Sequence, residues 1–165
     1  MDNLFFVASI NIELAETHDH FHVDLIDDER IIRAFMPANL WEGSVLRDYL
    51  DKNSLPLPNI YEITRDIFVA FGIKVKMVVV ADLVDGFFQI DTHLTLGKQA
   101  KVLSKRNSID PIILAHVIGA PVYVSLEASR KFYYEYIRPG INPDASSDIY
   151  EKMLKTLDSK KGYKM

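Results

Sequence analysis

The most informative absence in this sequence is cysteine. None of the 165 residues is a cysteine, which excludes disulfides, thiolate nucleophiles and thiolate metal sites and fits a reducing compartment. The chain also lacks any apolar run near the ~20 residues that span a bilayer. Its first residues, Met1-Asp2-Asn3, carry none of the basic charge that begins a signal peptide. We therefore expect a soluble, cytoplasmic protein with no membrane partner.

Excess positive charge is missing as well. Nineteen Lys and Arg stand against 23 Asp and Glu, for a formal net charge of −4, which argues against a generic high-affinity grip on phosphate backbones. The hydrophobic content of 48% and the charged content of 25% are ordinary for a globular protein with a real core. We expect one domain over residues 1–138 and an extension over 139–165 that is partly helical or disordered.

The stretch from Ala100 to Ser125 predicts the centre of the fold, as a strand, a turn, a buried helix and a second strand. Asp110-Pro111 favours a helix start, because Asp can cap the first free N–H groups and Pro fits the first helical position. The next residues are apolar almost all round, which predicts a buried helix closed by Gly119 in the left-handed conformation. Val122 to Val124 then predicts a short central strand.

The rest of the chain predicts strands at both ends of a helical segment. Strand-forming runs predict an N-terminal β-meander, and Asp85-Gly86 is a strong signal for a hairpin between two further strands. Two helices are predicted between the meander and this hairpin. Asn39 and Asn59 are their N-caps, and Glu42 completes a capping box with Asn39. The predicted strands are Leu4–Leu14, Phe21–Ile26, Arg30–Met36, Lys74–Leu83 and Phe87–Leu96, and a last helix runs from Leu126 to about Tyr136. The fold class is α+β with a mixed sheet.

Two motifs, together with the position of the Asp85-Gly86 hairpin, resemble the bifunctional nuclease (DNase/RNase) domain family. Ile118 to Ser125, IGAPVYVS, follows a short helix opened by Arg106, Ser108 and Asp110, and the family carries R-P-S-D-A…G-A-P-I-Y-V near its C-terminus. Glu42-Gly43 opens a helix, and Pro56-x-Pro58 ends the loop after it, which is similar to the family's E-A or E-G helix and its F-P-R-P-L-T-H-D segment. The order of elements matches over most of the chain.

The motifs also depart from the family pattern. The segment Arg106 to Asp110 is one residue longer than R-P-S-D, and Pro111 stands where Ala is usual. In the second motif, Leu57 and Tyr61 occupy the Arg and His positions, and Glu62 occupies the Asp position. The resemblance implies an α+β domain, a homodimer, and hydrolysis of DNA and RNA.

Phosphodiester hydrolysis needs an activated water and charge stabilisation, usually with divalent ions held by carboxylates. The resemblance implies Glu42, Glu62, Arg106 and Asp110 as catalytic candidates, Mg²⁺ or Mn²⁺ as the cofactor if the protein is catalytic, and DNA or RNA as the partner. The alternative role for each carboxylate is at a helix N-terminus, and for Arg106 an ion pair. The alternative function is a non-catalytic dimeric binding or regulatory module on the same scaffold.

A histidine-rich run is the other candidate site. In a strand, His20, His22 and Asp24 share one face, with His18 if the strand begins early. Two or three imidazoles and a carboxylate could bind zinc, nickel or another divalent ion. Ligands two residues apart on an extended strand are about 7 Å apart, which favours the alternative of an exposed polar face on an edge hairpin.

A helix that combines basic and aromatic residues is the last candidate. Arg130, Lys131 and Arg138 flank Phe132, Tyr133, Tyr134 and Tyr136. Such a helix could stack bases while its cations hold phosphates. The aromatic side chains wrap over more than one face, which favours the alternative, a packing contact with a second subunit or with the C-terminal tail.

Overall fold

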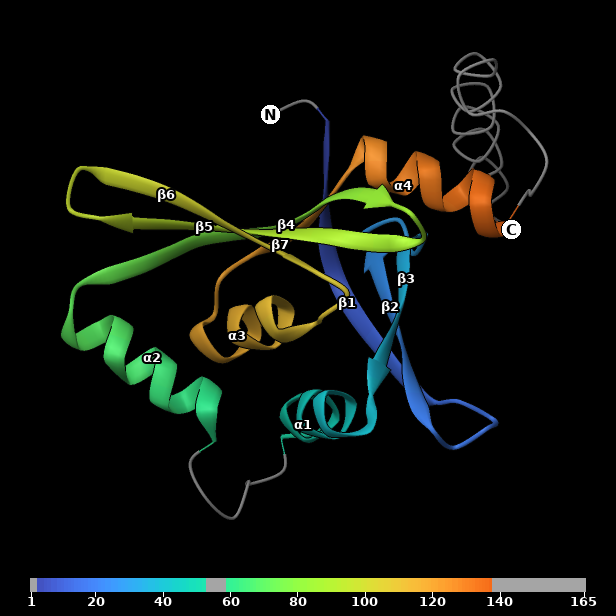
Figure 1. Cartoon of the computed structure of the whole chain (residues 1–165), viewed down its shortest axis with the longest axis horizontal. Helices are drawn as coiled ribbons and strands as arrows, with labels where there is room; N and C mark the ends of the chain where they lie inside the picture. Colours follow the sequence, from blue (N-terminus) through green and yellow to red (C-terminus); the bar gives the residue numbers. More distant parts are fainter. Residues whose placement is uncertain (1–2, 53–58, 138–165) are drawn as a thin grey trace, which may run out of the picture.

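A computed structural model describes residues 3–52 and 59–137 of the chain. It contains a mixed sheet of seven strands in the order β3-β2-β1-β7-β4-β5-β6, and α1, α2 and α3 lie on the opposite side of β4–β6 from α4 (Figure 1). The elements are β1 (Leu4–Leu14), β2 (His20–Asp27), β3 (Ile32–Asn39), α1 (Leu40–Leu50), α2 (Ile60–Ala70), β4 (Ile73–Val84), β5 (Phe87–Leu96), β6 (Gln99–Arg106), α3 (Asp110–Ile118), β7 (Val122–Ser125), α4 (Leu126–Phe132) and the π-helical turn η1 (Tyr133–Ile137). The predicted α+β class is confirmed. The expected extension over 139–165 and the Pro56-x-Pro58 turn lie outside the described residues.

The N-terminal meander forms as predicted, from antiparallel pairing of β1 with β2 and of β2 with β3. Alternate residues of β2 are buried, among them Val23 and Leu25. The third strand begins two residues later than expected, because Arg30 takes a left-handed backbone (φ 64°) in the turn. The buried carboxylate of Asp27 holds this turn, since it accepts the Ile31 N–H (2.9 Å) and pairs with Arg33 (2.6 Å).

Helices α1 and α2 both begin with a capping box. Asn39 Oδ1 accepts the Glu42 N–H (2.9 Å), and Glu42 Oε2 accepts the Asn39 N–H (3.3 Å), so the predicted capping box is confirmed. Asn59 and Glu62 repeat this arrangement at the start of α2. These reciprocal bonds satisfy N–H groups that have no partner within the helix.

The central unit β6–α3–β7 is where the sequence predicts it. β7 lies in the middle of the sheet, antiparallel to β1 and parallel to β4. Ile112 and Ile113 of α3 are fully buried, and Gly119 ends the helix with φ 77°. The expectation that Asp110 caps α3 is wrong: Asp110 is the first helical residue, and the N-cap position belongs to Ile109, whose side chain makes no capping bond. The Asp110 carboxylate is bound instead by α2, as described below.

The second half of the sheet is built from two hairpins. Asp85 (φ 53°) and Gly86 (φ 77°) both take left-handed conformations in the predicted β4–β5 turn, as a tight hairpin of this kind requires. β6 forms the edge of the sheet, and all eight of its residues are exposed. The last helix is shorter than predicted, since α4 ends at Phe132 and the chain continues as η1. Among the described residues, no helix is long and apolar enough to cross a membrane.

Candidate functional site

The N-terminal ends of α1 and α3 are joined by Ser108, in the loop after β6. Ser108 Oγ donates to Glu42 Oε1 (3.0 Å) and accepts the N–H of Asp110 (3.1 Å). One hydroxyl therefore links two of the carboxylate residues that the sequence singles out, although they are 68 positions apart. We call Glu42, Ser108, Asp110 and the tyrosine described next the acidic network.

Tyr61, in the first turn of α2, completes this network. Its hydroxyl donates to Asp110 Oδ1 over 2.5 Å. Burial of Tyr61, followed by this hydrogen bond and by the negative charges of Asp110 and Glu42, raises the pKa of the phenol well above its ordinary value of 10.0. The phenol therefore stays protonated and acts as a permanent hydrogen-bond donor to the Asp110 carboxylate.

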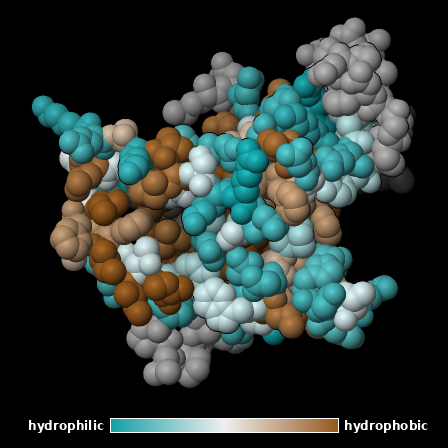
Figure 2. Space-filling model, viewed as in Figure 1, coloured by the Kyte–Doolittle hydropathy of each residue, from teal (hydrophilic) through white to brown (hydrophobic). Residues whose placement is uncertain are grey.

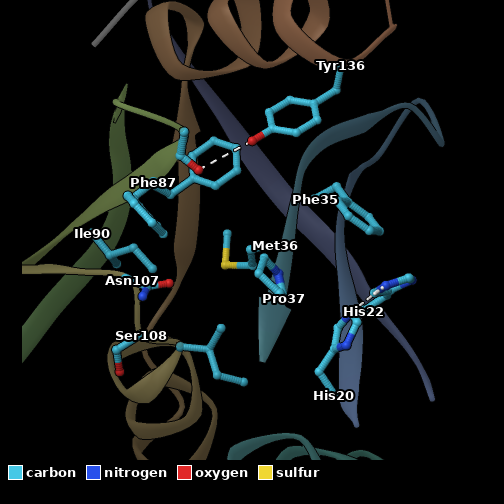
Figure 3. Close-up of a pocket in the computed structure, with 13 residues that line it drawn as sticks. His20, His22, Phe35, Met36, Pro37, Phe87, Ile90, Asn107, Ser108 and Tyr136 are labelled. Atoms are coloured by element: carbon cyan, nitrogen blue, oxygen red, sulfur yellow. Dashed lines mark hydrogen bonds between the residues drawn. The ribbon is translucent and has the colours of Figure 1, made fainter. Parts of the chain in front are cut away.

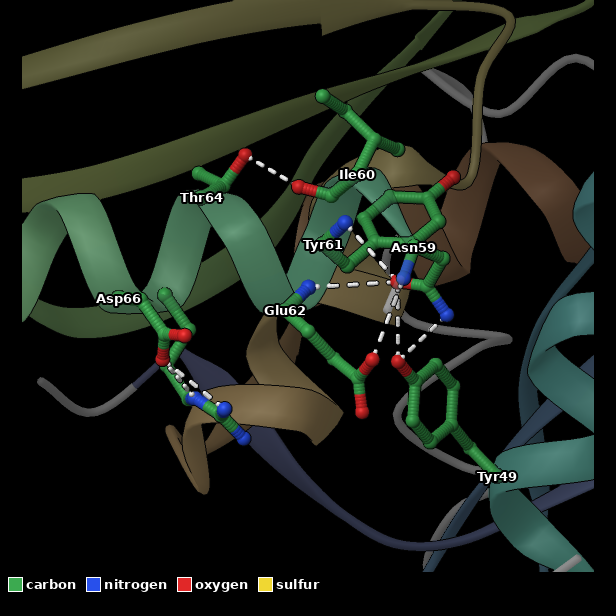
Figure 4. A network of polar contacts seen from close by, with 8 residues as sticks. Tyr49, Asn59, Ile60, Tyr61, Glu62, Thr64 and Asp66 are labelled. Carbon is green, nitrogen blue, oxygen red and sulfur yellow. Dashed lines mark hydrogen bonds and ion pairs between the residues drawn. The ribbon is translucent and has the colours of Figure 1, made fainter. Parts of the chain in front are cut away.

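The four catalytic candidates have different positions. Glu42 is only 8% exposed, and both its oxygens are hydrogen bonded, one in the capping box of α1 and one to Ser108. Glu62 caps α2: its Oε2 accepts the Asn59 N–H (3.2 Å), and Figure 4 shows its side chain turned towards Asn59 and Tyr49. Asp110 is exposed and points to α2. The structure therefore links the Glu42 carboxylate to the backbone of Asp110 through Ser108, whereas the Glu62 carboxylate bonds to Asn59 in the cap of α2.

The fourth candidate, Arg106, is the last residue of β6. Its side chain is exposed and lies outside the acidic network. Its backbone pairs with that of Gln89 on β5, which places it just before the loop that carries Ser108. Arg106 is therefore near the network in the chain without being bonded to it.

Asp110 and Tyr61 also line a groove of about 330 Å³ between α2, α3 and β6. Trp41 forms part of its wall, stacks on Tyr61 (ring centroids 5.8 Å apart, interplanar angle 26°) and is 54% exposed. Lys105 brings a positive charge to the same groove. The remaining lining residues are mostly apolar: Ile60, Thr64, Phe68, Thr92, Leu94, Leu103, Pro111 and Leu114. We call this the α2–β6 groove.

The oxygen atoms of the acidic network suit a hard divalent cation. Mg²⁺ usually binds one or two protein carboxylates and takes its other ligands from phosphates and water. Asp110 and Glu42 are the two residues that would hold such an ion. No group of three or more His, Asp or Glu side chains in the described part of the chain is placed to share a metal.

The histidine run lies in the β2–β3 hairpin at one edge of the sheet, with β3 as the edge strand itself. Its histidine-bearing face is only partly exposed, so the expected fully exposed polar face is not what the structure has. His20 and His22 are partly buried, and their rings turn towards each other until the two Nε2 atoms are 2.9 Å apart. His18 lies in the preceding turn with φ 59°, and Asp24 Oδ2 accepts from Asn11 Nδ2 (3.4 Å). The tilt of the rings therefore brings the two Nε2 atoms much closer than the spacing of alternate residues on a strand would.

These two histidines line a second cavity of about 270 Å³. Figure 3 shows their rings on one side of the cavity, with Asn107 and Ser108 on the other. Ser108 therefore contributes both to the wall of this cavity and to the hydrogen bonding of Glu42. The rest of the lining is mostly apolar, with Phe35, Met36, Pro37, Phe87, Phe88, Ile90 and Ile109.

The basic and aromatic helix is a packing element. Arg130 pairs with Glu127 (3.1 Å) and Lys131 with Asp82 (2.6 Å), and this hydrogen bond to Asp82 raises the pKa of Lys131. Phe132 is buried against Phe88, with ring centroids 6.1 Å apart. Over its described part, this helix packs against the domain itself, and Arg138 lies outside the described residues. The expected contact with a second subunit or with the tail stays a prediction.

Besides Ser108, which belongs to a family-like motif, three residues of the site were not candidates from the sequence. Tyr61 occupies the His position of the family-like motif, and that substitution was the available signal for it. Trp41 is the only tryptophan of the chain and adjoins a capping box. Lys105 could not be identified from the sequence, because its place in the same groove as Asp110 depends on the tertiary arrangement of β6, α2 and α3.

A comparison of the chain with models of known protein families found no match, and a comparison with curated proteins found none either. The resemblance to the bifunctional nuclease family rests on the quoted motifs and stays a prediction.

Proposed function

We propose that the protein acts on DNA or RNA as a metal-assisted nuclease of the kind that the family resemblance implies. The observation that carries the proposal is the position of Asp110. It is the one candidate carboxylate that serves no helix cap, and it lies in a groove with an exposed tryptophan and a lysine. The α2–β6 groove would receive the nucleic acid.

Local charge around the groove supports this choice despite the net charge of −4. Residues 97–106 contain four basic side chains and no acidic one, and all four are exposed: Lys98, Lys101, Lys105 and Arg106. Cations spaced along an edge strand can follow a phosphate backbone, and an exposed indole offers a surface on which a base stacks. Because stacking needs an unpaired base, the groove favours a single strand.

The acidic network would supply the chemistry. A Mg²⁺ or Mn²⁺ ion bound there neutralises phosphate charge and lowers the pKa of a bound water. Asp110 and Glu42 would hold it, while Tyr61 fixes the orientation of the Asp110 carboxylate. Glu62 has no part in this proposal. It completes a helix cap as Glu42 does, but its carboxylate bonds to Asn59, whereas that of Glu42 also bonds to Ser108 of the acidic network.

The test is cleavage of plasmid DNA and of a single-stranded RNA by purified protein with Mg²⁺, with Mn²⁺ and with EDTA. Asp110→Asn removes the charge and keeps an oxygen to accept from Tyr61. Glu62→Gln is the matched control, because Gln at this position also completes a capping box. We expect metal-dependent cleavage that falls at least tenfold in Asp110→Asn and persists in Glu62→Gln.

Three results would count against this assignment. Cleavage that survives EDTA excludes a metal-assisted reaction. Equal cleavage by Asp110→Asn and the unmodified protein points to other residues or to a contaminant. Equal loss in both variants, with unchanged unfolding midpoints, removes the distinction between Asp110 and Glu62.

The second candidate function is a non-catalytic dimeric binding or regulatory module. Two observations favour it: Glu42 and Glu62 both complete capping boxes, and apolar side chains are exposed beside the α2–β6 groove. Figure 2 shows these side chains gathered on the side of the molecule occupied by α2 and the β5–β6 hairpin. They include Ile60, Ile63, Ile67, Val69, Phe71, Leu96, Val102 and Leu103. No cleavage under any condition, with a dimer in solution, would select this function.

A further inference from the structure

We propose that His20 and His22 form a binding site for one divalent transition-metal ion, with a geometry that suits Ni²⁺ or Cu²⁺. The site is separate from the acidic network and does not rest on the proposed nuclease function. Both ligands come from β2, which is paired with β3 at both positions and with β1 at His22. On the β1 side, the Ala15 N–H donates to the His20 carbonyl (3.0 Å).

The distance between the two nitrogens selects the metal geometry. The Nε2 atoms are 2.9 Å apart and share a hydrogen bond in the metal-free protein. A metal ion would replace the shared proton, and imidazole nitrogens bind transition metals at ~2.0–2.1 Å. If an ion lay at that distance from both nitrogens, the N–metal–N angle would be about 90°. Tetrahedral ligands would lie about 3.4 Å apart by the same geometry. Adjacent positions of a tetragonal or octahedral ion therefore fit better, as Cu²⁺ and Ni²⁺ prefer.

Asp19 supplies the support that such a ligand usually has. Its Oδ1 lies 2.5 Å from His20 Nδ1, which favours the tautomer with the proton on Nδ1 and a lone pair on Nε2. Metal-bound histidines commonly donate their second ring N–H to a carboxylate in this way. Thr17 Oγ1 donates to the same oxygen over 2.5 Å and fixes the carboxylate in turn. Asp19 is thus a positioning residue for His20.

The surroundings leave room for the rest of the coordination shell. The two rings form part of the wall of a 270 Å³ cavity, and the Phe35 ring packs edge-on against His22, with centroids 4.8 Å apart. The described residues provide no third His, Asp or Glu ligand. Water or a small anionic ligand in the cavity would therefore complete the shell, which predicts an open, exchangeable site.

The first test needs no substitution. The full chain, without a histidine tag and stripped with EDTA, is titrated with NiCl₂ while the histidine ring protons are followed by NMR. Ring signals of His20 and His22 should broaden first and be lost by one equivalent, while those of His93 and His116 persist. Uniform broadening of all histidines, or none, would overturn the proposal.

Calorimetry with NiCl₂ measures the affinity and tests each residue. We expect one site, at least tenfold weaker in His20→Gln and in His22→Gln, and about tenfold weaker in Asp19→Asn, because outer-shell partners typically contribute 10–100-fold. His93→Gln is the matched control and should bind as the unmodified chain does. Absence of heat, or equal binding by the His20→Gln and His22→Gln variants, would overturn the site.

Discussion

The hydroxyl of Tyr61 lies 2.5 Å from Asp110 Oδ1, although the two residues are 49 positions apart. This bond joins the first turns of α2 and α3 and holds the only candidate carboxylate that is free of a helix cap. Tyr61 also stacks on Trp41 from α1. One buried tyrosine therefore connects three helices. It belongs to the acidic network and also lines the α2–β6 groove beside Trp41.

Tyr61→Phe should destabilise the protein by about 1–2 kcal/mol, because it removes a hydrogen bond to a charged group and keeps the ring. Urea unfolding at pH 7 measures this. The stacking partner Trp41 should keep its fluorescence maximum, since the phenyl ring remains. An unchanged unfolding midpoint would contradict a role for this bond in joining α2 to α3.

The same substitution should change the response to alkaline pH. The pKa of Tyr61 is raised in the folded protein, so its stabilising effect is complete below its ordinary pKa of about 10. Above that pH the unfolded chain ionises first, and stability is lost progressively. Tyr61→Phe should therefore lose less stability than the unmodified protein between about pH 9 and pH 11, as measured by urea midpoints. Parallel losses would contradict the raised pKa.

The buried pair of Asp27 and Arg33 predicts a strong, non-additive effect. Arg33→Met leaves the Asp27 charge buried without its partner, which should cost about 3–5 kcal/mol. Asp27→Asn in the same chain removes that charge, so the double variant should be more stable than Arg33→Met alone. A double-mutant cycle by urea unfolding measures the coupling, and additive losses would contradict it.

Gly43 is required by packing, although Ala is the better helix former. A Cβ at Gly43 would lie 2.2 Å from Cδ2 of Phe21, a buried ring of β2. We expect Gly43→Ala to destabilise by about 1–3 kcal/mol, because overpacking outweighs the gain of ~1 kcal/mol in helix propensity. Ser44→Ala, at the next position, is the control and should unfold near the original midpoint. Stabilisation by Gly43→Ala would show that Phe21 moves freely.

Trp41 should contribute to single-strand binding more than to folding. Loss of one stacking surface costs about 1–3 kcal/mol of binding per base, so Trp41→Ala should weaken binding of a labelled RNA about tenfold or more. Leu14→Ala, another exposed apolar position, should leave binding unchanged. Equal affinity of Trp41→Ala and the unmodified protein would exclude the α2–β6 groove as the binding surface.

The homodimer that the resemblance implies predicts self-association through the apolar side of α2. Phe71, at the C-terminal end of α2, is 70% exposed, and Ile67 one turn earlier is also exposed. Sedimentation equilibrium should give twice the chain mass, and Ile67→Glu with Phe71→Glu should give a monomer. A monomeric unmodified chain would contradict the prediction.

Features formed within a few residues could be predicted from the sequence. Asn39 and Glu42 meet because a helix places positions three apart within reach of each other, and Asn59 and Glu62 do the same. The left-handed Gly119 likewise follows from local backbone sterics. For this reason the order of elements and most of their bounds agree with the predictions.

Features that depend on partners far along the chain were decided by the tertiary structure. Asp110 fits a helix cap by its sequence, yet the packing of α2 on α3 gives it Tyr61 as a partner. His20 and His22 are too far apart on an ideal strand to share a ligand, yet their rings tilt towards each other until the Nε2 atoms are 2.9 Å apart. Both rings line a cavity formed with residues from distant parts of the chain. Local sequence limits the conformations open to a backbone segment. Which side chains then meet depends on how whole elements bury their apolar faces together, and that information is spread over the entire chain.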